Sequence, residues 1–351
     1  MVLKLFIFCL FISTQVQSKA IDEVRYTLGS SGVYVESDRV RARVLSIDAG
    51  LKVLEKIDSD ITVHAWLLGN FENGSNSAAG LKAEFQPNQA VNLMEGGLRY
   101  KPNDFFKVDV GTIWQNTHQS PLLVWGTSFA GVAEEFQFGD FKLKLQQSIP
   151  NNNILARRIG GVNEGTPYFF LETINYLKSN DHFHFNLDLS AFQFNNLYSQ
   201  VALVSQDFGN TVEGIGQAAR FTYGYQGYNL ATQFLKHLKN DYQIGFTGQY
   251  LYNQLAPTKR NVGYLGELNI GKKEALLKIG AFRNESDSSP AFYNSRFFGH
   301  NNMQGSVITM TGEKDNVMYR LQFVSGKNIE SNVRQADVSI VNFLIVRNYE
   351  I

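Results

Sequence analysis

Residues 182–191 read HFHFNLDLSA, and every second side chain changes character. One set is apolar: Phe183, Phe185, Leu187, Leu189 and Ala191. The intervening set is polar: His182, His184, Asn186, Asp188 and Ser190. Because side chains alternate across a β-strand, this segment predicts a strand with one apolar face and one polar face.

The same two-residue period recurs along the chain, whereas helical periodicity is nearly absent. Amphipathic segments with this pattern include 81–86, 106–114, 141–146, 220–226, 242–253, 262–270, 275–279 and 316–323. Short polar turns alternate with longer polar stretches around 151–166, 207–214 and 284–302. We predict about sixteen strands, within a range of fourteen to eighteen, joined alternately by short turns and long loops.

The N-terminus has the features of an export signal. Lys4 precedes an apolar run at 5–12, and Ser18-Lys19-Ala20 fits a cleavage site with small residues. We therefore predict a signal peptide over 1–20 and one domain over 21–351, the alternative being a buried N-terminal helix. The only cysteine, Cys9, lies inside the signal, so the mature chain does not depend on disulfides.

The composition excludes several classes of function. Basic and acidic residues balance at 32 each with no dense basic run, so no nucleic-acid partner is indicated. The sequence contains no G-x-S-x-G elbow and no Walker-type loop, and we predict that the protein is not an enzyme. His182 and His184 share a face and could chelate a metal, but two ligands do not make a site, so no metal and no cofactor are expected.

Strand number decides where the apolar face points. A soluble barrel of this size would enclose an apolar void, and a split into several soluble sandwiches would need a linker, which the composition does not show. With the apolar face outside, lipid solvates it and a closed ladder pairs every backbone group. We predict an all-β fold, a closed antiparallel transmembrane β-barrel.

An export signal, a cysteine-free mature chain and many strands of about ten residues resemble a Gram-negative outer-membrane porin or porin-like channel. The resemblance implies a passive diffusion channel for small hydrophilic solutes or ions, a homotrimer, and a place in the outer-membrane bilayer. The last predicted strand, 337–351, ends Tyr349-Glu350-Ile351, where Ile replaces the aromatic residue usual in such proteins. The alternative function is a non-conducting barrel that acts as an adhesin or receptor through its long loops.

Polar residues on the alternating strands are the candidates for lining a pore. Arg39, Arg41 and Arg43 form a basic ladder that could attract anions, or else a solvated strand face. The apolar phase changes near Leu45, which predicts a bulge or a new strand. The full set of pore-lining candidates is Arg39, Arg41, Arg43, Lys82, Glu84, Lys107, Asp109, Lys142, Lys144, His182, His184, Asp188, Arg220, Glu267, Lys278 and Arg320.

One segment is a candidate for narrowing the pore. Residues 118–131 (HQSPLLVWGTSFAG) include Pro121 and Trp125 and are unusually apolar for a free loop. They could fold into the lumen as a constriction, dip into the membrane as a hairpin, or form a further strand. Glu134 and Glu135 follow, and one of these two carboxylates would face the lumen.

Overall fold

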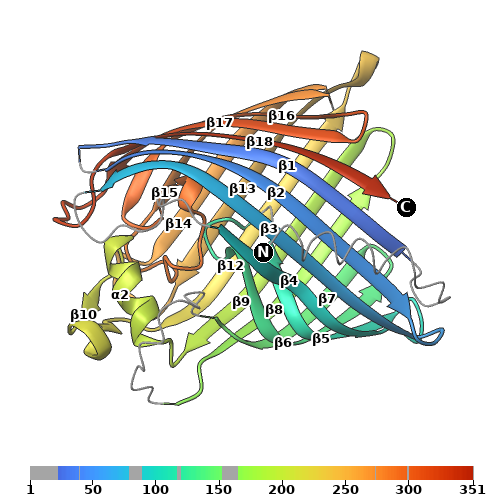
Figure 1. Cartoon of the computed structure of the whole chain (residues 1–351), viewed down its shortest axis with the longest axis horizontal. Coiled ribbons are helices and arrows are strands. Elements are labelled where there is room, and N and C mark those ends of the chain that lie inside the picture. Colours follow the sequence, from blue (N-terminus) through green and yellow to red (C-terminus); the bar gives the residue numbers. More distant parts are fainter. Residues whose placement is uncertain are drawn as a thin grey trace.

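The computed structural model describes residues 23–38, 40–78, 89–116, 120–151, 165–272, 274–298 and 300–350, and gives only the backbone at 40, 77, 78, 116, 296 and 350. The signal-peptide prediction and the segment 81–86 therefore lie outside the described residues. Within them, sixteen antiparallel strands close into one barrel, as predicted (Figure 1).

The first nine barrel strands are β1 (Glu23–Glu36), β2 (Val40–Lys56), β3 (Ile61–Ala78), β4 (Gln89–Tyr100), β5 (Phe106–Asn116), β6 (Trp125–Phe138), β7 (Phe141–Ile149), β8 (Tyr168–Ser179) and β9 (Phe183–Asn195). The remaining seven are β12 (Tyr225–His237), β13 (Tyr242–Asn253), β14 (Val262–Lys272), β15 (Ala275–Asn284), β16 (Met303–Lys314), β17 (Val317–Asn328) and β18 (Val338–Glu350). Sequential strands pair with each other, and β1 closes the ring by pairing with β18 from Arg25↔Glu350 to Glu36↔Ser339.

The two ends of the barrel differ. At one end the strands are joined by short turns, such as 139–140 between β6 and β7 and 315–316 between β16 and β17. At the other end lie long connections, and β18 ends on the opposite, short-turn side (Figure 1). The longest of these, between β9 and β12, carries α2 (Ser199–Asp207), η1 (Gly216–Ala218) and a small sheet of β10 (Val212–Glu213) and β11 (Arg220–Phe221).

Two short 3₁₀ turns complete the described elements: η2 (Lys239–Asp241) at the short-turn end and η3 (Arg296–Phe298) in the β15–β16 loop. No helix among the described residues is long and apolar enough to cross a membrane.

The apolar faces of the strands point outward. On β14, Leu268 and Ile270 are 71% and 53% exposed on the outside, while Glu267 and Asn269, which alternate with them, are buried on the inside. Side chains with this exposure in a water-soluble protein would form a large apolar surface, whereas lipid solvates them. The outward direction of the apolar face therefore agrees with the predicted transmembrane barrel.

Tyrosines mark the two edges of this apolar band. On β13, Tyr242 and Tyr250 face outward eight positions apart and are both about half exposed. Eight residues span about 27 Å along a strand, which corresponds to about 20 Å across the membrane at the tilt usual for such barrels. Aromatic rings at this spacing are expected where a protein crosses the two lipid–water interfaces.

The strand β2 corrects one sequence prediction. It runs without interruption from Val40 to Lys56, and its pairing with β1 and β3 shows no shift of register. The change of phase near Leu45 is therefore neither a bulge nor a new strand. It marks the place where the outward-facing side chains change from apolar to charged.

Candidate functional site

The barrel interior holds the candidate site, and its half nearest the short turns is polar and charged. Arg99 Nε lies 2.6 Å from Asp109 Oδ1, and Lys107 Nζ lies 3.2 Å from Asp109 Oδ2. Glu135 Oε2 forms ion pairs with the same Lys107 Nζ at 3.1 Å and with Lys142 Nζ at 3.7 Å. Strands β4 to β7 thus supply a chain of alternating charges along one inner wall.

The structure places most of the predicted pore-lining residues on this inner surface. Asp188 on β9 accepts a hydrogen bond from Asn175 Nδ2 at 2.7 Å, across the β8–β9 pair. The predicted residues on inward-facing positions of the strands are Lys107, Asp109, Lys142, Lys144, His184, Asp188, Glu267, Lys278 and Arg320. They lie on six strands, β5, β7, β9, β14, β15 and β17, so the polar wall extends around the barrel.

Other predicted residues lie elsewhere. Arg41 and Arg43 face outward, since Ala42 and Ser46 are the buried, inward-facing residues of this part of β2. His182 is exposed in the turn before β9, and Arg220 lies on β11 in the long β9–β12 loop. Arg39, Lys82 and Glu84 lie outside the described residues. The basic ladder therefore does not line the lumen over Arg41 and Arg43.

The half of the interior nearest the long loops is filled by loop residues and contains an apolar cluster, which the sequence did not predict. Phe129, Phe169 and Phe194 point inward from β6, β8 and β9 and are almost fully buried. Their partner is Tyr293 from the β15–β16 loop, whose ring centroid lies 5.1 Å from that of Phe129 and 5.8 Å from that of Phe194. Loop residues and the strand ends nearest the long loops thus form a hydrophobic core inside the barrel.

The predicted constriction segment is divided between a loop and a strand. Residues 120–124 lie inside the barrel, with Pro121 and Leu122 buried, whereas β6 begins at Trp125. Leu122 N donates to Gln249 Oε1 on β13 at 3.0 Å, and Asn229 Nδ2 on β12 donates to Ser120 Oγ at 2.9 Å. The loop therefore reaches across the interior to a distant wall, while residues 125–131 form the alternative that we considered, a further strand. Residues 118 and 119 lie outside the described residues.

The two glutamates after this segment separate as the alternation of β6 requires. Glu135 faces the interior with Phe129 and Ala133, and Glu134 faces outward with Val132. Only Glu135 can therefore contribute charge to the lumen. Glu134 lies two positions from Phe136 on the outer face, near the short-turn end.

The loop between β15 and β16, residues 285–302, also enters the interior, and many of its described side chains are buried. Ser289 Oγ donates to the carbonyl of Leu122 at 2.7 Å, and Ser295 N donates to the carbonyl of Pro121 at 2.9 Å. Farther down, the ring of Phe297 lies under the guanidinium of Arg320 at 5.3 Å. The sequence predicts a long polar loop here, which the structure confirms, but it does not predict that the loop lies inside the barrel.

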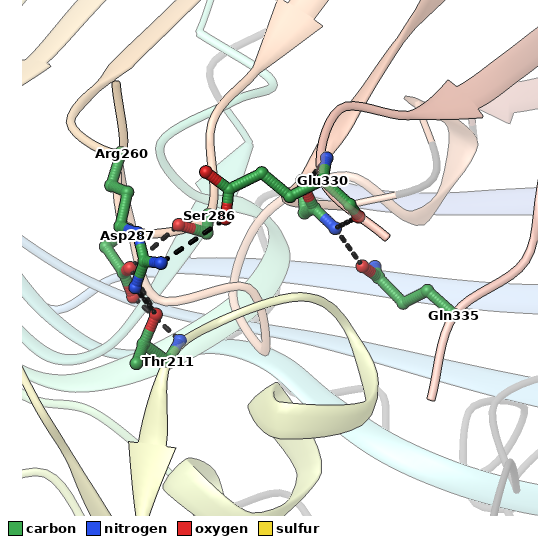
Figure 2. Close-up of polar contacts among 7 residues, drawn as sticks. Thr211, Arg260, Ser286, Asp287, Glu330 and Gln335 are labelled. Carbon is green, nitrogen blue, oxygen red and sulfur yellow. Dashed lines mark hydrogen bonds and ion pairs between the residues drawn. The ribbon is translucent and has the colours of Figure 1, made fainter. Parts of the chain in front are cut away.

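A polar cluster ties four long loops together (Figure 2). Asp287 from the β15–β16 loop accepts hydrogen bonds from Thr211 N at 2.9 Å and Thr211 Oγ1 at 2.7 Å. Arg260, between β13 and β14, donates to Thr211 Oγ1 at 3.3 Å and lies 3.4 Å from Glu330 Oε2 in the β17–β18 loop. Asn302 Nδ2 adds a hydrogen bond to Gln335 Oε1 at 3.0 Å. We call these residues the loop latch.

Burial affects the titration of the loop latch. Asp287 has no exposed surface, and this desolvation raises the pKa of its carboxyl above the usual 3.8, against the hydrogen bonds from Thr211 and Ser286 that lower it. An acid whose pKa is raised on folding contributes stability that is complete below its unfolded pKa and is lost as pH rises through the folded pKa. The loop latch should therefore be tighter in acid than at neutral pH.

This pH dependence can be measured by hydrogen exchange at the Thr211 amide, corrected for the intrinsic exchange rate. We expect its protection to decrease as pH rises from about 3.8 through the raised pKa of Asp287 in the unmodified protein. In Asp287→Asn, which has no charge to desolvate, protection should be nearly constant over this range. An equal slope in both proteins would show that another group controls the loop latch.

Within the ranges that the structure describes, no group of three or more His, Cys, Asp or Glu side chains is arranged to hold a metal ion. Of the two histidines considered for chelation, His182 lies in the turn before β9 and His184 lies on the strand.

Comparisons with known proteins support the fold. No family model matches the chain, and no curated protein matches its sequence. Among solved structures, OprB of Pseudomonas putida superimposes with a TM-score of 0.66 at 10% identity, covering 96% of each chain. OccK7 (OpdD) of Pseudomonas aeruginosa gives a TM-score of 0.56 at 10% identity, covering 95% of this chain and 100% of that one.

A third structure, OmpF of Salmonella typhi in complex with daunomycin, gives a TM-score of 0.53 at 12% identity over 94% of this chain and 97% of that one. These neighbours are outer-membrane porins and channels, and at such identities the likeness shows the fold. The predicted resemblance to porins is confirmed at this level.

Proposed function

We propose that this porin-like barrel is an outer-membrane channel through which small hydrophilic solutes or ions diffuse passively. The proposal rests on the charged inner wall in the short-turn half of the barrel. The outer face of the same barrel carries an apolar band with exposed tyrosines at its edges. Such a wall replaces part of the hydration of a passing solute, and the infolded loops limit its size. The predicted signal peptide over 1–20 would direct the chain to this membrane.

The direct test is conductance in a planar bilayer. The purified protein should insert and produce discrete, long-lived current steps in potassium chloride, and liposomes that contain it should swell in solutions of small neutral solutes. A barrel that inserts, shown by heat-modifiable migration on SDS gels, and passes no current would contradict the proposal. The predicted homotrimer can be checked on the same preparation by its mass in detergent.

Selectivity should depend on Glu135. Replacing Glu135 by Gln leaves Lys107 and Lys142 without the carboxylate that both contact, so the inner wall becomes more positive. We expect the permeability ratio of chloride to potassium to increase by about threefold, since charge inside a narrow, poorly screened passage raises the local concentration of the opposite ion. The reversal potential across a salt gradient measures this ratio.

The neighbouring residue provides a matched control. Glu134→Gln removes the same charge one position away, but on the outer face of β6. It should leave the reversal potential unchanged. Equal shifts in the two variants would mean that the charge chain of β4 to β7 does not border the ion path.

The second candidate function is a receptor, and the filled long-loop half of the barrel favours it. Next to α2, a cavity of about 210 Å³ is bordered by aromatic and amide side chains, among them Phe194, Phe221, Tyr225 and Asn196. A concave surface of this chemistry can take a ligand without passing it through the barrel. Absence of conductance together with saturable binding of a ligand to the long-loop side would favour the receptor.

A further inference from the structure

The outer surface of β1 to β3 at the long-loop end carries two exposed arginines. The side chain of Arg41 is 63% exposed, and Arg43 is exposed two positions further along the same outward face of β2. Two residues span about 6.7 Å along a strand, so the two guanidinium groups lie on one face at adjacent outward positions. The channel proposal does not use them, because they face away from the lumen.

An apolar strip leads directly to these arginines. Leu45 and Ile47 continue the outward face of β2 toward the membrane centre and are 54% and 61% exposed. Ile47 pairs with Phe71 on β3, whose ring is also exposed. The same face therefore changes from lipid-solvated side chains to cations within one step of the alternation, as expected where acyl chains end and headgroups begin.

Neighbouring side chains hold the arginines against the barrel. The guanidinium of Arg43 lies over the ring of Tyr34 at 5.4 Å, and Tyr34 Oη donates to Glu36 Oε2 at 2.8 Å. Glu36 Oε1 in turn lies 3.1 Å from Arg41 Nη2. An aromatic ring under a guanidinium fixes the orientation of the guanidinium plane. The N–H groups at the edge of the guanidinium then remain able to donate hydrogen bonds to a phosphate oxygen.

We propose that Tyr34, Arg41 and Arg43, which we call the arginine rim, bind the phosphate headgroup of a lipid in the leaflet on the long-loop side. The acyl chains of that lipid would lie along Leu45 and Ile47. Arginine suits phosphate because its planar fork donates two parallel hydrogen bonds, and the position beside the apolar strip selects a phosphate attached to a lipid. The inference needs only the membrane-spanning fold and is independent of solute passage.

The chain contains a matched control on the opposite membrane surface. Arg347 on β18 faces outward at the short-turn end, with its guanidinium 5.0 Å from the centre of the Tyr349 ring. It resembles Arg43 over Tyr34 in this contact, but the residue two positions before it on that face is Ile345, which is apolar. A single cation of this kind should bind a headgroup with two phosphates less well than the arginine rim.

The experiment titrates the purified full-length protein in detergent micelles with lipid A carrying two phosphates and counts bound lipid by native mass spectrometry. We expect Arg41→Gln/Arg43→Gln to bind about twenty-five-fold more weakly, since each cation near a charged membrane surface contributes about fivefold. Arg347→Gln should bind as the unmodified protein does. Lipid A from which both phosphates have been removed should bind the unmodified protein no more tightly than it binds the double variant.

Several results would overturn the proposal. The double variant could bind as tightly as the unmodified protein, Arg347→Gln could lose as much, or the dephosphorylated lipid could bind equally well. Displacement of the lipid by an equal concentration of inorganic phosphate would assign the arginine rim to soluble phosphate. Conductance of the double variant should equal that of the unmodified channel, so failure of the channel proposal would be seen separately from failure of lipid binding.

Discussion

Leu268→Arg is expected to lower the free energy of unfolding of the membrane-inserted barrel by about 2 to 4 kcal/mol. Leu268 is 71% exposed on the outer face of β14, four positions from Tyr264 at one edge of the apolar band and four from Lys272 at the other. It therefore lies at the bilayer midplane, where a cation has neither water nor a headgroup within reach. Denaturant titration in lipid vesicles, followed by heat-modifiable migration on gels, measures the change.

The control tests depth in the membrane. Gln193→Arg introduces the same cation on the outer face of β9, but near the long-loop end, two positions beyond Ala191, which pairs with the exposed Tyr228 of β12. Its cost should be below about 1 kcal/mol, because a charge near the interface can reach water. Equal costs for the two variants, or a cost near zero for Leu268→Arg, would contradict the position assigned to the membrane.

Much of this architecture was predictable because a strand's period is two and lipid demands an apolar outer face. In 182–191 the alternation correctly assigned Leu187 and Leu189 to the outside and His184 and Asp188 to the inside. The number of amphipathic segments then predicted sixteen strands. Both inferences rest on local pattern, and closing the backbone ladder leaves little choice about how such strands associate.

The pattern fails where a strand leaves the membrane. In β9 the alternation continues past Ala191, but its chemistry reverses, so that Phe192 and Phe194 point inward and Gln193 and Asn195 point outward. The same reversal places Arg41 and Arg43 on the outer face of β2. Periodicity identifies which side chains share a face, whereas the direction of that face depends on what surrounds the strand at that height.

The burial of the β15–β16 loop inside the barrel was not predictable from local sequence. Residues 284–302 are rich in Asn and Ser, which normally indicates a solvated loop. Inside the barrel their polar groups bond to one another instead, as when Asn301 Nδ2 donates to the carbonyls of Ser286 at 2.9 Å and Ser289 at 2.6 Å. A network that satisfies itself can be buried, and only the structure shows that its partners come together.

Replacing residues 286–300 with a short Gly/Ser linker should increase single-channel conductance about three- to fivefold, because a sixteen-stranded barrel is wide enough for a water-filled lumen once the loop is removed. This loop supplies Tyr293, which packs on the inward-facing rings of Phe129 and Phe194, and Phe297, which lies beside Arg320. Loops at one end of the barrel contribute no ladder pairing, so the strands should still close. Current steps in planar bilayers and swelling of liposomes in larger neutral solutes measure the change.

The matched control shortens the β17–β18 loop at 331–334, where Val333 is 85% exposed. Its removal should leave conductance unchanged, because this segment does not enter the apolar core inside the barrel. Unchanged conductance after removal of 286–300 would show that solutes do not pass through the space this loop fills. A closed unmodified barrel that conducts only after removal of 286–300 would instead identify the loop as a plug, and would favour the receptor function over free diffusion.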